Sequence, residues 1–164
     1  MIKEKVLSAL NKQLNEEFYS SYVYLAMAAY FENTSLTGFA HWMKVQSREE
    51  YDHAIKIYDF IHRVNGKVHL KKIDSPKVEW KSPMDVVKEM YEHEKKVTES
   101  INEIVDLSVE EKDHATTIFM QWFVNEQIEE EDTALRLLDK LKMVGDNKNG
   151  LYILDRELAA RAAE

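Results

Sequence analysis

Apolar residues recur every three or four positions along most of this 164-residue chain, which is the spacing of one face of an α-helix. Glycine and proline, which interrupt helices, occur only four times and twice. The pattern therefore predicts an all-α fold in a single domain: a four-helix bundle with one long crossover loop and a short fifth helix at the C-terminal end. The predicted helices cover about 4–32, 36–65, 83–107, 111–143 and 150–162, and the crossover loop covers 66–81.

The predicted crossover loop has no helical periodicity and contains Pro76. Extended chain advances about 3.3 Å per residue, so this loop can reach roughly 50 Å, whereas a helix of about 29 residues is about 43 Å long. The loop is therefore long enough to run the length of the bundle. Gly66 is expected to end the second helix in a left-handed conformation. Ser82 and Pro83 are expected to start the third helix as its N-cap and first helical residue.

Polar side chains interrupt the apolar face of each long predicted helix. Glu17 and Glu50 are 33 residues apart, as are Glu94 and Gln127, so each lies near the middle of its helix. We therefore expect the four side chains to meet halfway along the bundle, where an unpaired carboxylate would cost several kcal/mol. Buried carboxylates are tolerated when they are paired, neutralised or bound to metal ions. The alternative is that the helix register has slipped and that these side chains face water.

The candidate ligands suit a pair of divalent metal ions. Glu50 and His53 stand at positions i and i+3, so they project from one helix face. The spacing is weak evidence by itself, because Glu111 and His114 share it near a predicted turn, where we expect them to be solvated. Four carboxylates would neutralise two divalent ions, and carboxylate with imidazole suits Fe²⁺, Mn²⁺ or Zn²⁺. These carboxylates are Glu17, Glu50, Glu94 and Glu130.

Composition and charge argue against several other functions. The formal charge of −8 and the lack of a basic run argue against nucleic-acid binding and favour cations as partners. Without cysteine, the chain can form no disulfide and no thiolate metal site. The N-terminus carries charges where a signal peptide needs an apolar run, and the near-apolar stretch 22–31 is far short of the ~20 residues that span a bilayer. We therefore expect a cytoplasmic protein that does not bind membranes.

Four segments of the chain resemble bacterial non-haem ferritins, and the resemblance covers almost the whole sequence. These segments are NEEFYSSYVYLAMAAYF, QSREEYDHAIKIYDFI, MYEHEKKVTESINEI and FMQWFVNEQIEEE. The resemblance implies that the ligands of a paired-iron ferroxidase site are Glu17, Glu50, His53, Glu94 and Gln127. It implies an adjacent third iron position at Glu49, Glu126, Glu129 and Glu130. Tyr24 matches the tyrosine beside the site; its alternative role is that of an ordinary core tyrosine.

The resemblance also implies what the chain does. It predicts an iron-storage protein that binds two Fe(II) per subunit, oxidises them with O2 or H2O2, and keeps Fe(III) mineral inside a hollow homo-oligomeric shell of 24 subunits. The short fifth helix would line the fourfold axes of that shell. Haem is not expected, because Tyr51 stands where the haem-ligand methionine of bacterioferritins would fall. On the residues alone, a di-iron or di-manganese redox enzyme and a metal-free helical adaptor remain open.

Overall fold

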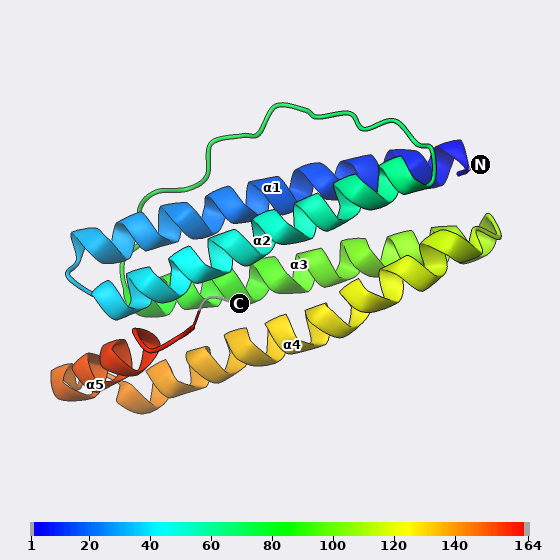
Figure 1. The fold of residues 1–164 in the computed structure, drawn as a ribbon. Coiled ribbons are helices and arrows are strands. Elements are labelled where there is room, and N and C mark those ends of the chain that lie inside the picture. The colour runs from blue at the N-terminus through cyan, green and yellow to red at the C-terminus, as the bar shows by residue number, and fades with distance from the viewer. Residues whose placement is uncertain (1, 163–164) are drawn as a thin grey trace.

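The computed structural model describes residues 2–162, which contain five helices. Figure 1 shows four long helices side by side and a short fifth helix across one end of the bundle. The all-α prediction is confirmed. The helices are α1 (Glu4–Asn33), α2 (Thr37–Arg63), α3 (Pro83–Glu110), α4 (His114–Val144) and α5 (Lys148–Leu158).

The observed helix ends differ from the predicted ones by a few residues. The third helix continues to Glu110 instead of 107, and α4 starts at His114 instead of 111. The reason is the N-cap of α4, where Asp113 accepts a hydrogen bond from the Thr116 N–H at 3.1 Å. The fifth helix starts two residues earlier than predicted, because the Asn147 side chain caps it, and it ends at Leu158 instead of 162.

The second helix also ends differently from the prediction. The left-handed residue is Asn65, with φ 56°, and not Gly66. Asparagine adopts this conformation more easily than most residues do. A Cβ at Gly66 would lie 2.8 Å from Leu7 Cδ1 and 2.9 Å from Ile61 Cγ2, so a larger residue there would make these side chains shift. The predicted end of this helix, residue 65, is thus two residues beyond the observed end at Arg63, and the left-handed residue that follows the helix is an asparagine and not the expected glycine.

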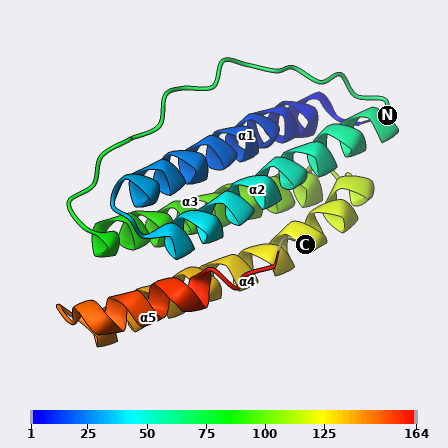
Figure 2. The ribbon, with the colours of Figure 1, turned by 60° about the vertical axis from the view of Figure 1, so that its left-hand side comes forward.

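The crossover segment 64–82 runs along the outside of the bundle from one end to the other (Figures 1 and 2). Two asparagines of α1 fasten its first part. Asn11 Nδ2 donates to the Lys67 carbonyl at 3.0 Å, and Asn11 Oδ1 accepts from the His69 N–H at 2.6 Å. Asn15 repeats this pattern, donating to the His69 carbonyl and accepting from the Lys71 N–H. Each amide thus satisfies backbone groups that have no helical partner.

Two apolar clusters fill the bundle, one towards each end, and a polar layer separates them. The cluster nearer α5 has as its largest fully buried side chains Tyr24, Met27, Phe31, Phe39, Met43 and Met90. The other cluster has Leu10, Leu14, Ile57, Ile61, Ile101 and Phe123. The helical spacing of these residues explains why they share the interior. The polar layer is therefore enclosed by apolar packing on both sides.

The fifth helix is held on the bundle by an unusual N-cap. The residue at the N-cap of α2, Leu36, makes no side-chain capping hydrogen bond. Instead, the buried Asp155 of α5 accepts a hydrogen bond from the Phe39 N–H at 2.9 Å. Gly38 allows this approach, since a Cβ there would lie 1.7 Å from the Asp155 carbonyl oxygen. A carboxylate at a helix N-terminus is favoured by the helix dipole. Asp155 thus links the position of α5 to the start of α2.

Gly38→Ala should displace α5 from the bundle. The added methyl group meets a backbone oxygen, which cannot move without the helix that carries it. We expect a loss of about 3 kcal/mol in the free energy of unfolding and a melting temperature lower by roughly 6–12 °C. Differential scanning calorimetry measures both. The control is Gly150→Ala, where the new Cβ lies 3.4 Å from Val144 and alanine favours the helix; equal stability of the two variants would contradict the prediction.

Candidate metal centre

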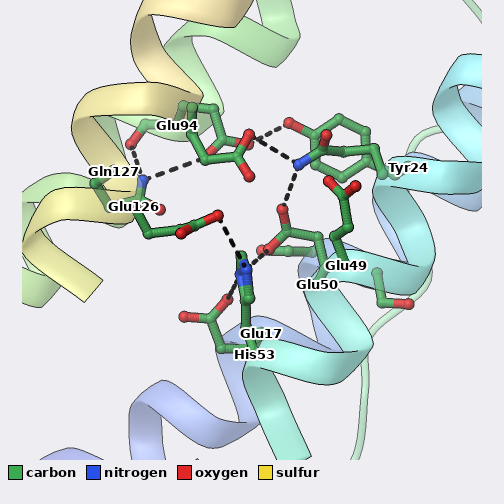
Figure 3. Close-up of polar contacts among 12 residues, drawn as sticks. Glu17, Tyr24, Glu49, Glu50, His53, Glu94, Glu126 and Gln127 are labelled. Atoms are coloured by element: carbon green, nitrogen blue, oxygen red, sulfur yellow. Dashed lines mark hydrogen bonds and ion pairs between the residues drawn. The ribbon is translucent and has the colours of Figure 1, made fainter. Parts of the chain in front are cut away.

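The predicted ligands lie together in the polar layer, and they come from all four long helices. Figure 3 shows Glu17 of α1, Glu50 and His53 of α2, and Glu94 of α3 pointing towards one central space. Glu17 and Glu94 are each only 1% exposed, although both can ionise. Gln127 and Glu130 of α4 are buried in the same layer. The alternative of a slipped register with water-facing carboxylates is therefore wrong.

Glu50 is common to two groups of candidate ligands. One group is Glu17, Glu50 and His53, and in it one ligand atom of each residue lies within 4.8 Å of the others. The second group, with the same spacing, is Glu50, Glu94 and Glu130. Two triads that share one carboxylate can hold two cations side by side, with Glu50 between them. We call them the histidine triad and the carboxylate triad.

The histidine triad contains an oxygen atom that no described group satisfies. Glu17 Oε1 accepts a hydrogen bond from Gln13 Nε2 at 2.8 Å, but Glu17 Oε2 is buried without a hydrogen-bond partner within residues 2–162. This oxygen lies 3.9 Å from His53 Nδ1, and Glu50 Oε2 lies 3.5 Å from the same nitrogen. Buried polar atoms are nearly always paired. Three ligand atoms around one point, one of them unpaired, fit a bound cation.

Burial makes the carboxylates of the site difficult to ionise. Burial and the negative charge of Glu50 raise the pKa of Glu17 to about 8. The same two causes raise the pKa of Glu94 to about 8. Burial and the charges of Glu50 and Glu94 raise the pKa of Glu130 well above its ordinary value. Without a cation the site therefore retains protons at neutral pH, and a divalent ion must displace them.

In Glu50 and His53, by contrast, the neighbouring groups favour the charged form. Burial disfavours the charged form of Glu50, but hydrogen bonding and attraction to His53, together with a hydrogen bond from Gln46, lower its pKa below the ordinary value. Burial also lowers the pKa of His53, but the carboxylates of Glu126, at 3.7 Å, and Glu50, at 3.5 Å, outweigh it and raise that pKa to about 11. In the metal-free site, protonated His53 thus takes the place of a cation beside Glu50.

Tyr24 and Gln127 both hydrogen-bond to Glu94. The buried Tyr24 hydroxyl donates to Glu94 Oε1 in a short hydrogen bond, and Gln127 Nε2 donates to Glu94 Oε2 at 3.2 Å. Burial and the neighbouring Glu94 raise the pKa of Tyr24 well above its usual value, so the phenol keeps its proton. Tyr24 therefore contacts a candidate ligand carboxylate directly.

Only part of the predicted third iron position is assembled. Glu126 and Glu130 form a group with His53, and Glu126 Oε1 lies 3.7 Å from His53 Nε2. Glu49 pairs instead with Arg161, and Glu129 is exposed. Neither Glu49 nor Glu129 belongs to a candidate metal group among the described residues. A third site made of all four carboxylates remains a prediction.

The second Glu-x-x-His sequence lies apart from the centre. Glu111 forms an ion pair with Lys5 at 3.0 Å beside the turn between α3 and α4, and His114 is the first residue of α4. Neither side chain belongs to a candidate metal group of residues 2–162. Position along the bundle, and not the motif itself, therefore separates the two pairs.

Three residues at the site were not predicted to take part in it. Gln13 donates to Glu17, and Gln46 donates to Glu50 at 2.8 Å and to Glu130 at 2.9 Å. Arg161, beyond the end of α5, donates to Gln46. The available signal was a glutamine four residues before a ligand glutamate, which occurs in both α1 and α2. No comparable signal marks Arg161.

No helix in the described part of the chain is long and apolar enough to cross a membrane.

Comparison with known proteins finds a family model described as a ferritin-like domain, which matches residues 7–144. The chain is 42% identical to the bacterial non-heme ferritin of Bacteroides fragilis over 98% of its own length and 100% of the relative's. It is 36% identical to that of Campylobacter jejuni, over 95% and 93%. Its fold matches the open pore ferritin of the archaeon Archaeoglobus fulgidus, with a TM-score of 0.97 at 46% identity and 98% coverage of both chains.

Proposed function

The chain belongs to the ferritin family, and from this premise we propose that it stores iron after oxidising Fe(II) at its buried metal centre. The observation that carries the proposal is the sharing of Glu50 by two buried ligand triads. A single metal would need only one triad, and a purely structural core would not place four carboxylates where their pKa values are disturbed. The predicted ligands are therefore proposed to hold two Fe(II) as substrate.

The proposed reaction is the oxidation of two Fe(II) by dioxygen or peroxide. Each Fe(II) loses one electron, and a dioxygen molecule that takes both electrons and two protons becomes hydrogen peroxide. The chain's own contribution is to hold two cations close together, so that both electrons leave one site. Four carboxylates and one imidazole match the preference of iron for oxygen and nitrogen ligands. Haem is not part of the proposal.

The two triads differ in ligand type, and this difference suggests different tasks. The histidine triad combines two carboxylates with an imidazole, whereas the carboxylate triad offers oxygen ligands only. We assign looser binding to the carboxylate triad. The group of His53, Glu126 and Glu130 lies next to it and offers Fe(III), which prefers oxygen ligands, a way out of the centre. Glu49 and Glu129 would complete this route.

The proposed assembly is a hollow shell of identical subunits in the cytoplasm, with 24 subunits in the form that the family resemblance implies. The position of α5 supports it. This helix is docked at one end of the bundle through Leu154 and Leu158, and it leaves Tyr152 and Ile153 exposed beside Met143. Exposed apolar side chains at one end suit contacts between subunits.

Aerobic iron loading followed by size-exclusion chromatography tests this proposal. We expect a particle many times larger than the 19.3 kDa chain, which keeps far more iron per chain than its binding centre can hold. Iron and protein are measured in the same fractions. A small oligomer that keeps at most two irons per chain would contradict storage and favour a di-iron redox enzyme. No iron binding at all would favour a helical adaptor.

A further inference from the structure

Two glutamines hold ligand carboxylates of the centre in the same way. Gln13 and Gln46 each stand four residues before a ligand, and each donates from Nε2 to Oε1 of that glutamate at 2.8 Å. Both amides are buried, at 1% and 0% exposure. Only the nitrogen end of an amide can donate to a carboxylate, so the orientation of each amide decides whether it attracts or repels its ligand.

The oxygen end of each amide is bonded to a different part of the chain. Gln13 Oε1 accepts from the Ser100 hydroxyl at 2.6 Å, within the bundle. Gln46 Oε1 accepts from Arg161 Nη2 at 2.9 Å, and Arg161 lies 115 residues later in the sequence, after α5. A guanidinium has donors only and keeps its charge in proteins. It therefore allows just one orientation of the Gln46 amide.

Several contacts fix Arg161 in this position. Its Nη2 also donates to Glu49 Oε2 at 2.5 Å, and its guanidinium lies 4.2 Å above the centre of the Trp42 ring. A ring nitrogen of His41 lies 2.8 Å from the Arg161 carbonyl oxygen. The side chain is only 21% exposed. All three partners belong to α2, so Arg161 is fastened to the helix that carries Glu50.

We propose that Arg161 is a positioning residue of the metal centre, acting through Gln46 on Glu50 and Glu130. Held by Arg161, Gln46 Nε2 bonds one oxygen of Glu50 and one of Glu130. The bond to Gln46 leaves Glu50 Oε2 beside His53 Nδ1, at 3.5 Å, and it fixes Glu50 and Glu130, both of the carboxylate triad, relative to each other. Without Arg161 the amide can turn its oxygen towards the carboxylates, and the two ligands lose their common anchor. The inference rests on the proposed function, because it assigns Arg161 to one of the two proposed metal positions.

Anaerobic Co²⁺ titration of the assembled, metal-free protein tests this inference. In Arg161→Gln we expect the dissociation constant of the weaker of two Co²⁺ sites to rise about tenfold, which is within the range for loss of a residue that holds a metal ligand. The tighter site, which contains Glu50 but not Glu130, should change less. The visible absorption of the second Co²⁺ should also change. Simple loss of a positive charge would tighten cation binding, so a weaker site identifies positioning. Unchanged or tighter binding would overturn the inference.

Three further variants make the test specific. Arg161→Lys keeps a charged group that only donates, so it should weaken this site less than Arg161→Gln does. Arg156→Gln, on the exposed side of α5, loses only a bond to Tyr152 and should match the parent. With Gln46→Ala already present, Arg161→Gln should add less than a twofold effect. Full additivity would overturn the inference, whereas a parent protein that binds fewer than two Co²⁺ would instead contradict the proposed function.

Discussion

Replacing Glu50 with alanine is expected to abolish rapid Fe(II) oxidation. Glu50 belongs to both triads, so its loss removes a ligand from each metal position at once. It also removes one of the partners that support the charge of His53. Removal of one residue that hydrogen-bonds a metal ligand lowers metal affinity or activity about 10–100-fold. Loss of a ligand that both metal positions share should therefore lower the initial rate by more than about 100-fold. Stopped-flow absorbance of the ferric product, at two Fe(II) per chain, measures this rate.

Two further variants separate lost chemistry from lost folding. Glu50→Gln keeps the size of the side chain and can still hydrogen-bond, but it removes the charge, so it should be as slow as the alanine variant while melting like the parent. Glu111→Ala removes a glutamate from the other Glu-x-x-His sequence, where its partner is Lys5. This variant should oxidise Fe(II) at the parent rate. An unchanged rate in Glu50→Ala would rule out the shared-ligand assignment.

The polar layer was predictable because helical periodicity decides which residues share a face. Glu17, Glu50 and Glu94 occupy apolar stripe positions at equal distances from the turns, and these distances alone bring them to one level. The same reasoning identified Glu111 and His114 as residues outside the centre. The fold and the convergence of these carboxylates halfway along the bundle therefore followed from spacing, with the family resemblance adding the kind of metal and reaction.

The contacts behind the ligands were not predictable in the same way. Periodicity places Gln46 inside the bundle, but it does not tell which end of its amide faces Glu50. That orientation depends on Arg161, whose position follows from the docking of α5 through Asp155 and Gly38. Such long-range contacts leave no periodic signal in the sequence. The same holds for Glu49, which the resemblance assigns to iron and the structure pairs with Arg161.

The raised pKa values indicate how the metal-free protein should respond to pH. The unfolded chain releases the protons of Glu17 and Glu94 near pH 4.5, whereas the folded chain keeps them to about pH 8. The folded chain therefore binds more protons between these values, so its stability falls as pH rises through this window. His53 acts in the same direction between pH 6.5 and about 11. Glu50, whose pKa is lowered, changes stability only below pH 4.5.

The metal-free protein should thus lose stability between pH 6.5 and 8, where four groups act together: Glu17, Glu94, Glu130 and His53. Each contributes at most about 1.4 kcal/mol per pH unit. We expect a fall of about 3 kcal/mol in the free energy of unfolding, and a melting temperature lower by roughly 6–12 °C. Calorimetry at fixed scan rate, across this pH range, measures the fall. A flat or rising profile would contradict the assigned protonation states.

Zn²⁺, which oxygen does not oxidise, should counteract this loss of stability. A bound divalent ion replaces the protons that Glu17 and Glu94 hold in the metal-free site, so it binds more tightly as pH rises. At one hundred times the dissociation constant, each bound ion adds about 2.7 kcal/mol of stability. The gap in melting temperature between the zinc-loaded and metal-free protein should therefore widen from pH 6.5 to 8. Glu17→Gln mimics the protonated carboxyl at every pH. In this variant the stability of the metal-free protein should fall less steeply with pH, and the gap in melting temperature should widen less. A fall as steep as in the parent would show that Glu17 is not among the groups that hold the protons.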